Sequence, residues 1–225
     1  MRYDEPKILS SQLNRICLKG ADVGQLAVLV KVSRELLQDS INIETILPNV
    51  LAAAMAAELD RVALIGTGTA PQPRGIVNFS AVQSIAHGAE LTAYTPLIKA
   101  RTLIKTVNHP GVSAYIMHPR DEGALASLTA TDGQPLALPP AIASVPMLTT
   151  SALPVDLGTG TDESMIIAGD FAKLMIGLRH GIQIELLKER YADSGQYAFI
   201  AHMRADVQAE HENAFVKISG IAPTA

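Results

Sequence analysis

An unbroken alternation of apolar and polar residues near the end of the chain is its clearest structural pattern. It runs from residue 198 to residue 210, and its apolar positions are the odd-numbered residues Phe199, Ala201, Met203, Ala205, Val207 and Ala209. Successive side chains of a strand point to opposite faces of a sheet, so this period of two predicts one long strand with a polar face. Residues 193–195, Asp-Ser-Gly, predict the turn before it.

Shorter apolar runs predict further strands at residues 26–32, 112–117, 165–168 and 174–176, and alternation returns at residues 182–186. The first of these runs lies in residues 1–30, which hold no helical periodicity. We expect this opening to form an extended arm or hairpin, which is poorly stabilised by itself because a lone hairpin buries little surface. Such an arm is better explained by packing on a partner, which indicates a subunit of an assembly.

Three helices are predicted from strong helix formers and from the prolines and glycines beside them. The longest covers residues 48–65, with Pro48 in its first turn, where the missing N–H costs nothing, and Gly66 as its stop. A second begins with Thr95 as N-cap and Pro96 at the first helical position. A third, shorter helix covers residues 119–128. Helices mixed with mainly antiparallel strands predict an α+β fold.

Composition narrows the possible classes of protein. The 225 residues suit one large domain or two small ones, and 48% hydrophobic with 18% charged residues excludes a disordered chain. Lys and Arg number 18 against 22 Asp and Glu, without a dense basic run, which argues against a high-affinity nucleic-acid binder. The lone Cys17 excludes an internal disulfide, and the longest apolar stretch is far shorter than a membrane span.

Candidate chemistry is sparse. His202, Asp206 and Glu210 are spaced by four, which would align them as metal ligands on a helix. On the predicted strand they lie about 13 Å apart, on a face that we expect to meet solvent. The Gly-Thr-Gly-Thr run at residues 66–69 follows a helix and precedes prolines, the reverse of a phosphate-binding loop. We therefore predict no catalytic, cofactor-binding or metal site, and no enzyme.

Five sequence blocks, in order along the chain, carry a resemblance to a known family. They are VKVSRELLQDS at residues 30–40, ELDRVALIGTGTAPQPRGI at 58–76, AYIMHPRD at 114–121, IIAGDFAKLMIGLRHGIQIE at 166–185 and AFVKI at 214–218. Together they resemble the major capsid proteins of tailed bacteriophages and prophages. The resemblance implies the Hong Kong 97 fold, with a long spine helix, a long antiparallel β hairpin and a mixed α/β axial domain.

The resemblance also implies a domain organisation and partners. Residues 1–28 would be part of an extended loop, residues 29–88 and 179–211 a peripheral domain, and residues 89–178 and 212–225 an axial domain. The chain would begin inside the extended loop, as a subunit truncated at its N-terminus. It would be made in the host cytoplasm and assemble with itself into pentamers and hexamers of the virion shell. Further partners would be a portal or scaffold protein and the enclosed double-stranded DNA, without a cofactor or a membrane.

Polar residues within the matched blocks are the candidates for intersubunit contacts or for ion pairs that brace the domains. They are Ser33, Arg34, Glu35, Arg74 and Arg179. The alternative is that they are ordinary exposed polar and charged residues, whose ion pairs each contribute less than about 1 kcal/mol. Two other functions are alternatives. One is an encapsulin-like shell that holds cargo enzymes, and the other is a small-molecule enzyme, which predicts a discrete apolar pocket with convergent polar groups.

Overall fold

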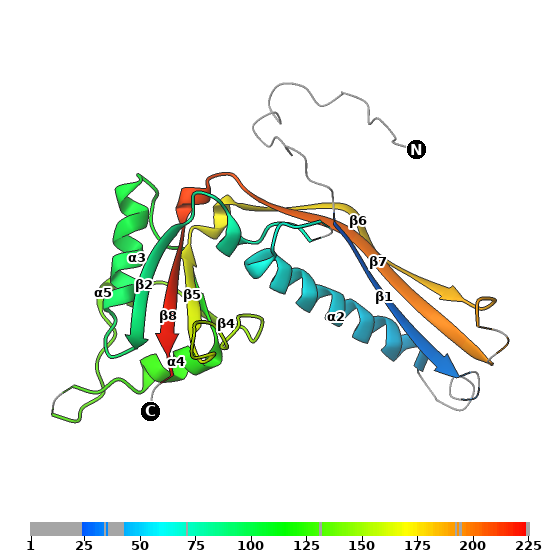
Figure 1. Ribbon diagram of the computed structural model, residues 1–225, viewed down its shortest axis with the longest axis horizontal. Helices are drawn as coiled ribbons and strands as arrows, with labels where there is room; N and C mark the ends of the chain where they lie inside the picture. The colour runs from blue at the N-terminus through cyan, green and yellow to red at the C-terminus, as the bar shows by residue number, and fades with distance from the viewer. Residues whose placement is uncertain are drawn as a thin grey trace, which may run out of the picture.

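The computed structural model describes residues 24–33, 35, 43–70, 72–130, 132–191, 193 and 195–223, and within them the strands form two sheets in two lobes of an elongated molecule (Figure 1). The strands are β1 (Gly24–Ser33), β2 (Gln83–Glu90), β3 (Ala114–Met117), β4 (Met147–Thr149), β5 (Ser164–Gly169), β6 (Leu174–Leu187), β7 (Gln196–Ala209) and β8 (Phe215–Ala222). The α-helices are α2 (Ile43–Ile65), α3 (Thr95–Thr106), α4 (Pro119–Ala126) and α5 (Pro140–Ala143). Short 3₁₀ turns are η2 (Ile76–Asn78), η3 (Phe171–Lys173) and η5 (Glu212–Ala214).

The long sheet, with strand order β1-β7-β6, confirms the strand predicted from the alternating residues. Both neighbours of β7 run antiparallel to it, and β1 pairs along its whole length, from Gly24 opposite Ala205 to Ser33 opposite Gln196. The odd-numbered side chains of β7 face α2 and form a core with it. This core contains Val32, Leu51, Met55, Phe199, Ala201, Met203 and Ala205. The opposite face of the sheet, formed by the even-numbered residues of β7 and their cross-strand partners, is called the outer face below.

Helix α2 starts at Ile43, so the prediction that Pro48 occupies its first turn is wrong. Pro48 lies inside the helix, where it removes one backbone hydrogen bond. Leu47, on the turn before Pro48, packs against the core of the long sheet. Burial of the Leu47 side chain stabilises the helical turn before Pro48. This stabilisation exceeds the cost of the one backbone hydrogen bond that Pro48 cannot form.

The predicted end of α2 is confirmed, but glycine is required there for a different reason. The N–H of Gly66 donates to the carbonyl of Val62 at 2.8 Å, and the Gly66 carbonyl accepts from the N–H of Gly75 at 2.9 Å. A Cβ on Gly66 would lie 2.3 Å from the carbonyl oxygen of Pro73. The side-chain amide of Asn78 donates to the Gly66 carbonyl at 2.8 Å and closes the turn. Glycine therefore permits the close approach of two backbone segments.

The second sheet has the strand order β2-β8-β5-β3-β4, in which β5 runs antiparallel to both neighbours while β2–β8 and β3–β4 are parallel pairs. The predicted strands at 112–117 and 165–168 are confirmed, with β3 two residues shorter at its start. Strand β2 was not predicted, because its sequence QSIAHGAE lacks an apolar run and most of its side chains are exposed. The main core of this lobe includes Leu97, Ile104, Tyr115, Ile166 and Val216, all buried beneath α3 and its neighbours.

Helix α3 begins one residue after its cap, and that cap is Tyr94 rather than the predicted Thr95. The Tyr94 hydroxyl, which is buried, donates to the carbonyls of Leu125 and Leu136, both at 3.2 Å. These contacts join the start of α3 to the end of α4 and the loop that follows it. Tertiary contacts at Tyr94 therefore fix the boundary, and the capping preference of threonine does not decide it.

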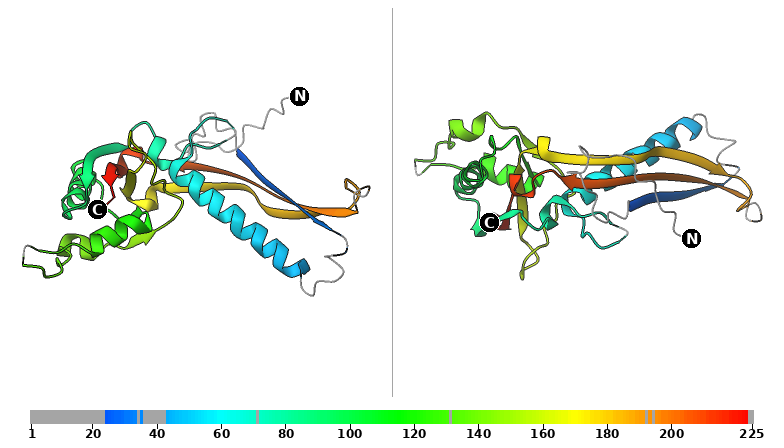
Figure 2. Two further views of the ribbon diagram at one scale, coloured as in Figure 1. Left: turned by 60° about the horizontal axis from the view of Figure 1, so that its bottom comes forward. Right: turned by 90° about the horizontal axis from the view of Figure 1, so that it is seen from above.

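Strand β6 joins the predicted run at 174–176 and the predicted alternation at 182–186 in one strand of 14 residues. Two register shifts against β7 flank His180, so β6 carries extra residues there. Such bulges bend a strand and change where its side chains point, which is why the period of two fails between the two segments. The chain passes from β5 of the second sheet to β6 through η3, and it returns from β7 to β8 through η5 (Figure 2).

Candidate functional site

The sequence-predicted contact residues lie at separate places on the molecule. Ser33 is the exposed last residue of β1, and Glu35 is exposed shortly after it, while Arg34 lies outside the described residues. Arg179 is exposed in the bulged part of β6, beside Leu178, which pairs with Ala205. Along β7, Ala205 lies nine positions from Gln196, the partner of Ser33, which corresponds to roughly 30 Å. These residues therefore do not form one compact site.

Arg74 lies in the loop between α2 and η2, near the junction of the two lobes. Its backbone forms an isolated antiparallel bridge with Thr67. Its side chain lies over Gly68, where an added Cβ would come within 3.0 Å of the Arg74 Nε. The arginine is exposed.

The spaced residues His202, Asp206 and Glu210 do not form a metal site, and no group of three potential ligands was found among the residues that the structure describes. The expectation that they share a solvent-facing side is wrong for Asp206, which is only 6% exposed. Its carboxylate accepts from the N–H of Val207 at 2.8 Å, which compensates for the water lost on burial. His202 forms a 3.0 Å hydrogen bond with Gln183 of β6.

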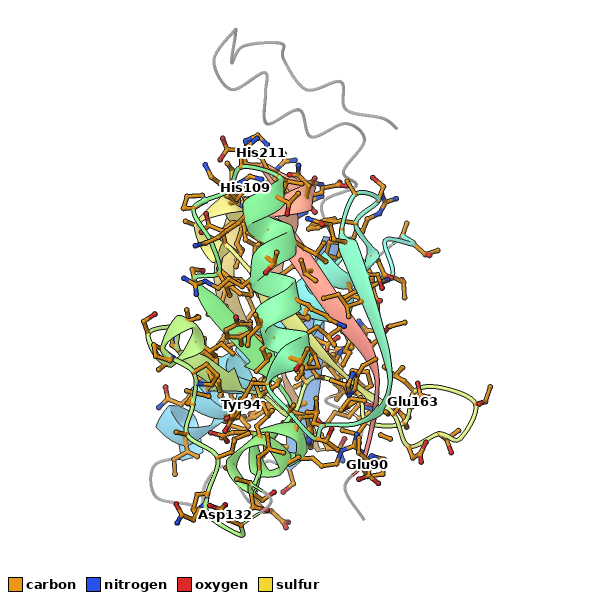
Figure 3. The ribbon with its side chains drawn as sticks, turned by 90° about the vertical axis from the view of Figure 1, so that its left-hand side faces the viewer. Glu90, Tyr94, His109, Asp132, Glu163 and His211 are labelled. Atoms are coloured by element: carbon orange, nitrogen blue, oxygen red, sulfur yellow. The ribbon has the colours of Figure 1, made fainter. Side chains whose placement is uncertain are left out.

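A polar cluster, which the sequence did not reveal, joins the two crossings between the sheets. Lys173 of η3 donates to Glu210 at 3.0 Å, and this hydrogen bond lowers the pKa of the Glu210 carboxyl below its usual value. The rings of His109 and His211 lie 5.4 Å apart, close together beside the end of α3 (Figure 3). His109 also forms a 3.0 Å hydrogen bond with Asn213 of η5. The cluster ties the linking segments to the lobe that contains α3.

A second polar contact lies in the same lobe, at the start of α4. Asp121 is 1% exposed and accepts from the Ser164 hydroxyl at 2.7 Å. The neighbouring Arg120 reaches from α4 to the carbonyls of Asp162 and Ile221, at 2.9 and 3.3 Å. The position of Asp121 in the first turn of α4 also places its charge near the positive end of the helix. These contacts hold α4 against the sheet.

Between the lobes, α2 faces the loop after β4 across a groove of about 480 Å³. Its lining includes Ala54, Ala57, Glu58, Arg61 and Ser151. Arg61 donates to both carboxylate oxygens of Glu58, at 2.6 and 2.8 Å, and these contacts lower the pKa of Glu58. The small side chains of Ala54 and Ala57 leave space beside this helix. None of the helices in the described residues has the length and apolar character needed to cross a membrane.

Large apolar side chains are exposed on β6, on the face that α2 covers further along the sheet. They include Leu178, 59% exposed, and three others along the same strand, Ile176, Ile182 and Leu186. Helix α2 packs mainly on β1 and β7 and leaves this row of the edge strand β6 open. Exposed apolar rows of this kind are typical of surfaces that bind other proteins.

Comparisons with known proteins agree on one family and one fold. A sequence model described as the phage capsid family matches residues 12–220. The capsid of an empty GTA particle shares 20% identity and a TM-score of 0.71, over 89% of this chain and 74% of that one. For the capsid of Myoviridae Phage XM1 the values are 14% identity, a TM-score of 0.67, and 88% and 73% coverage.

An encapsulin has the same fold. The holo-SrpI encapsulin complex from Synechococcus elongatus PCC 7942 is 14% identical, with a TM-score of 0.64 over 90% of this chain and 75% of that one. No curated protein sequence matches the chain. At such low identities, structural likeness establishes the fold alone, and it confirms the predicted Hong Kong 97 type of α+β fold.

Proposed function

Because the chain belongs to the phage capsid family, we propose that it is a repeating structural subunit of the shell of a phage or prophage head. The observation that carries this proposal is the family match over residues 12–220, together with a fold shared with capsids along most of the chain. An elongated molecule of two lobes, with exposed apolar side chains on an edge strand, fits a subunit that buries surface against its copies.

The division into domains forms part of the proposal. The peripheral domain comprises residues 29–88 and 179–211, and the long sheet with α2 supports most of this range. Its bounds differ from the sheets at two places, because β2 pairs with β8 of the other sheet and β6 of the long sheet begins at Leu174. The axial domain comprises residues 89–178 and 212–225, and the separate core beneath α3 supports it. Residues 1–28 are assigned to the extended loop, and residues 1–23 of that segment lie outside the described residues.

Ser33, Arg34, Glu35, Arg74 and Arg179 are proposed as contacts between subunits or between domains. The exposure of Ser33, Glu35, Arg74 and Arg179 supports this role. Replacing Glu35 by alanine is expected to weaken oligomers while leaving the unfolding midpoint of the monomer unchanged. If the Glu35→Ala variant assembles as well as the unchanged protein, Glu35 is an ordinary solvent-exposed charge without a role in assembly.

Assembly into pentamers and hexamers is the testable core of the proposed function. The experiment is the solution mass of the purified chain by light scattering over a range of concentrations, with negative-stain microscopy of the same fractions. Rings of five or six subunits, or closed shells, are the expected result. A monomer at every concentration would contradict assembly by this chain alone.

The proposed shell has a structural role and no catalytic one. In it the chain would contact portal or scaffold proteins, enclose double-stranded DNA without reading its sequence, and remain in the virion after synthesis in the host cytoplasm. The net charge of −4 fits enclosure better than tight DNA binding. Nuclease-resistant DNA that copurifies with shells is the expected result.

A second candidate function is an encapsulin-like compartment, which the structural similarity to the SrpI encapsulin favours. The two functions predict different contents of the shell. Shells purified from cells that carry the neighbouring genes would hold double-stranded DNA in a phage head, and a protein cargo in a compartment. Mass spectrometry and nucleic-acid absorbance on the same particles distinguish them.

A further inference from the structure

Arg204 is a charged side chain of the long sheet that forms no ion pair with the residues that the structure describes. It lies on the central strand β7, on the outer face, and is half-buried. Its Nε is shielded from solvent and has no hydrogen-bond partner. No ion pair joins its guanidinium to any residue in the described part of the chain. A desolvated N–H group without a hydrogen-bond partner raises the free energy of the folded state. Such a group is therefore suited to bind an acceptor from another molecule.

The nearest polar side chains along β7 on either side of Arg204 form hydrogen bonds with other groups. Asp206, two residues along the same face, receives the N–H of Val207 at 2.8 Å, with the Gln208 amide at 3.5 Å from its other oxygen. His202, two residues in the other direction, is hydrogen-bonded to Gln183. The nearest acceptors on β7 therefore do not neutralise the guanidinium.

The backbone opposite Arg204 is irregular on one side. His180 of β6 pairs with Arg204, and register shifts lie on both sides of this pair. Bulges widen and twist a sheet locally and are frequent where a strand presents a side chain for binding. The only cation among the β7 residues of this face thus lies beside the most distorted part of the edge strand.

We propose that Arg204 binds a carboxylate of a second copy of this chain. The proposal rests on the proposed function, because it requires the chain to self-associate. The chain carries 22 acidic against 18 basic residues, so each copy offers an excess of carboxylates. A guanidinium donates two parallel hydrogen bonds to a carboxylate, and the shielded Nε gives such a pair a weakly screened environment.

The surroundings favour a protein carboxylate over a DNA phosphate. Asp206 and the exposed Glu185 lie on the same face, so they would repel the several phosphates that a DNA backbone brings to it more strongly than one carboxylate. Nucleic-acid binding needs several clustered cations, whereas Arg204 stands between two carboxylates on this face.

The experiment compares the full chain with its Arg204→Gln, Arg204→Lys and Lys173→Gln variants. Light scattering at increasing protein concentration, in low and in high salt, measures the concentration at which oligomers form. Arg204→Gln is expected to raise that concentration about tenfold and to reduce its salt dependence, since one charge pair is lost at each contact. Arg204→Lys keeps the charge but loses the paired donors, so its effect is smaller.

Lys173→Gln is the control, because Lys173 already pairs with Glu210 of its own chain. It should leave the oligomer concentration unchanged, and Arg204→Gln should leave the unfolding midpoint of the monomer unchanged. The Arg204 proposal is overturned if the unchanged protein assembles and Arg204→Gln assembles at the same concentration. It is also overturned if duplex DNA binds the unchanged protein and the Arg204→Gln substitution weakens that binding. A monomer in every variant, the unchanged protein included, instead contradicts assembly by this chain alone, the part of the proposed function on which the Arg204 proposal rests.

Discussion

Gly75 has no side chain, and this permits its backbone to lie close to the backbone at the end of α2. A Cβ at Gly75 would lie 2.3 Å from the backbone N of Gly66 and 2.7 Å from the carbonyl oxygen of Val62. Both neighbours are backbone atoms at the end of α2, so they cannot rotate away. Gly75→Ala is therefore expected to lower the free energy of unfolding by about 2–4 kcal/mol, measured by urea denaturation.

Gly123 supplies the matched control for that substitution. It lies in α4, and an added Cβ would meet no atom within 4 Å. Gly123→Ala should stabilise the chain by about 0.5–1 kcal/mol, because alanine loses less backbone entropy on folding. Equal effects of the two substitutions would show that close approach at Gly75 does not matter.

The pair between Lys173 and Glu210 predicts a pH dependence. The hydrogen bond from Lys173 lowers the pKa of Glu210 below its usual value of 4.5. A carboxyl whose pKa is lowered by folding stabilises the folded state above its unfolded pKa, and this contribution is lost as pH falls through the folded pKa. Lys173→Met should return the Glu210 pKa towards 4.5, as an NMR titration of the carboxyl carbons would show. Glu58, which pairs with Arg61, is the internal control and should titrate unchanged.

At the scale of elements, Pro48 makes α2 less stable than its sequence composition suggests. The helix has 23 residues, and Pro48 follows its fifth residue. Pro48→Ala restores an N–H donor and removes a steric conflict in the preceding turn, which should raise the free energy of unfolding by about 1–3 kcal/mol. Chemical denaturation measures the change in the free energy of unfolding, and circular dichroism measures the helix content of the variant.

A matched substitution elsewhere on α2 separates this effect from a change in surface polarity. Ala53→Ser, at an exposed position of the helix, should alter stability by no more than about 0.5 kcal/mol. A Pro48→Ala variant less stable than the unchanged protein would mean that the proline is needed to bend α2 onto the long sheet.

At the scale of the whole molecule, each lobe has its own core. Met55, fully buried, packs with β7 residues of the long sheet, whereas Ile166 of β5 is buried in the core beneath α3. Met55→Ala should cost about 2–5 kcal/mol and raise amide hydrogen exchange in α2, β1 and β7. Protection in β5 and β8 should remain.

The reciprocal substitution tests whether the lobes are independent. Ile166→Ala should raise exchange in β5 and β8 and leave β7 protected. Equal loss of protection in both lobes, for either variant, would show a single cooperative unit. The apolar core that joins the end of α2 to β5 and β8, which contains Leu64, Met165 and Phe215, would then couple the two lobes together with the polar cluster around Lys173 and Glu210.

The sequence alone determined the elements whose signal is local and repeated. The period of two in β7 is a direct consequence of strand geometry with one face on a core, so residues 198–210 predicted it without knowledge of its neighbours. The run of helix formers after Pro48 likewise predicted most of α2. Sequence blocks spread along the chain indicated the capsid family, and the match to residues 12–220 agrees with them.

Tertiary structure decided everything that depends on residues far apart in the chain. Strand β2 has little apolar pattern of its own and forms by parallel pairing with β8. The burial of Asp206 depends on its packing within the long sheet, and the Lys173–Glu210 contact spans 37 residues. The unpaired Nε of Arg204 could not be read from an alternating pattern that marks the whole face as polar. A local pattern specifies which way a side chain points, but only the surrounding fold sets whether water, a neighbour or nothing meets it.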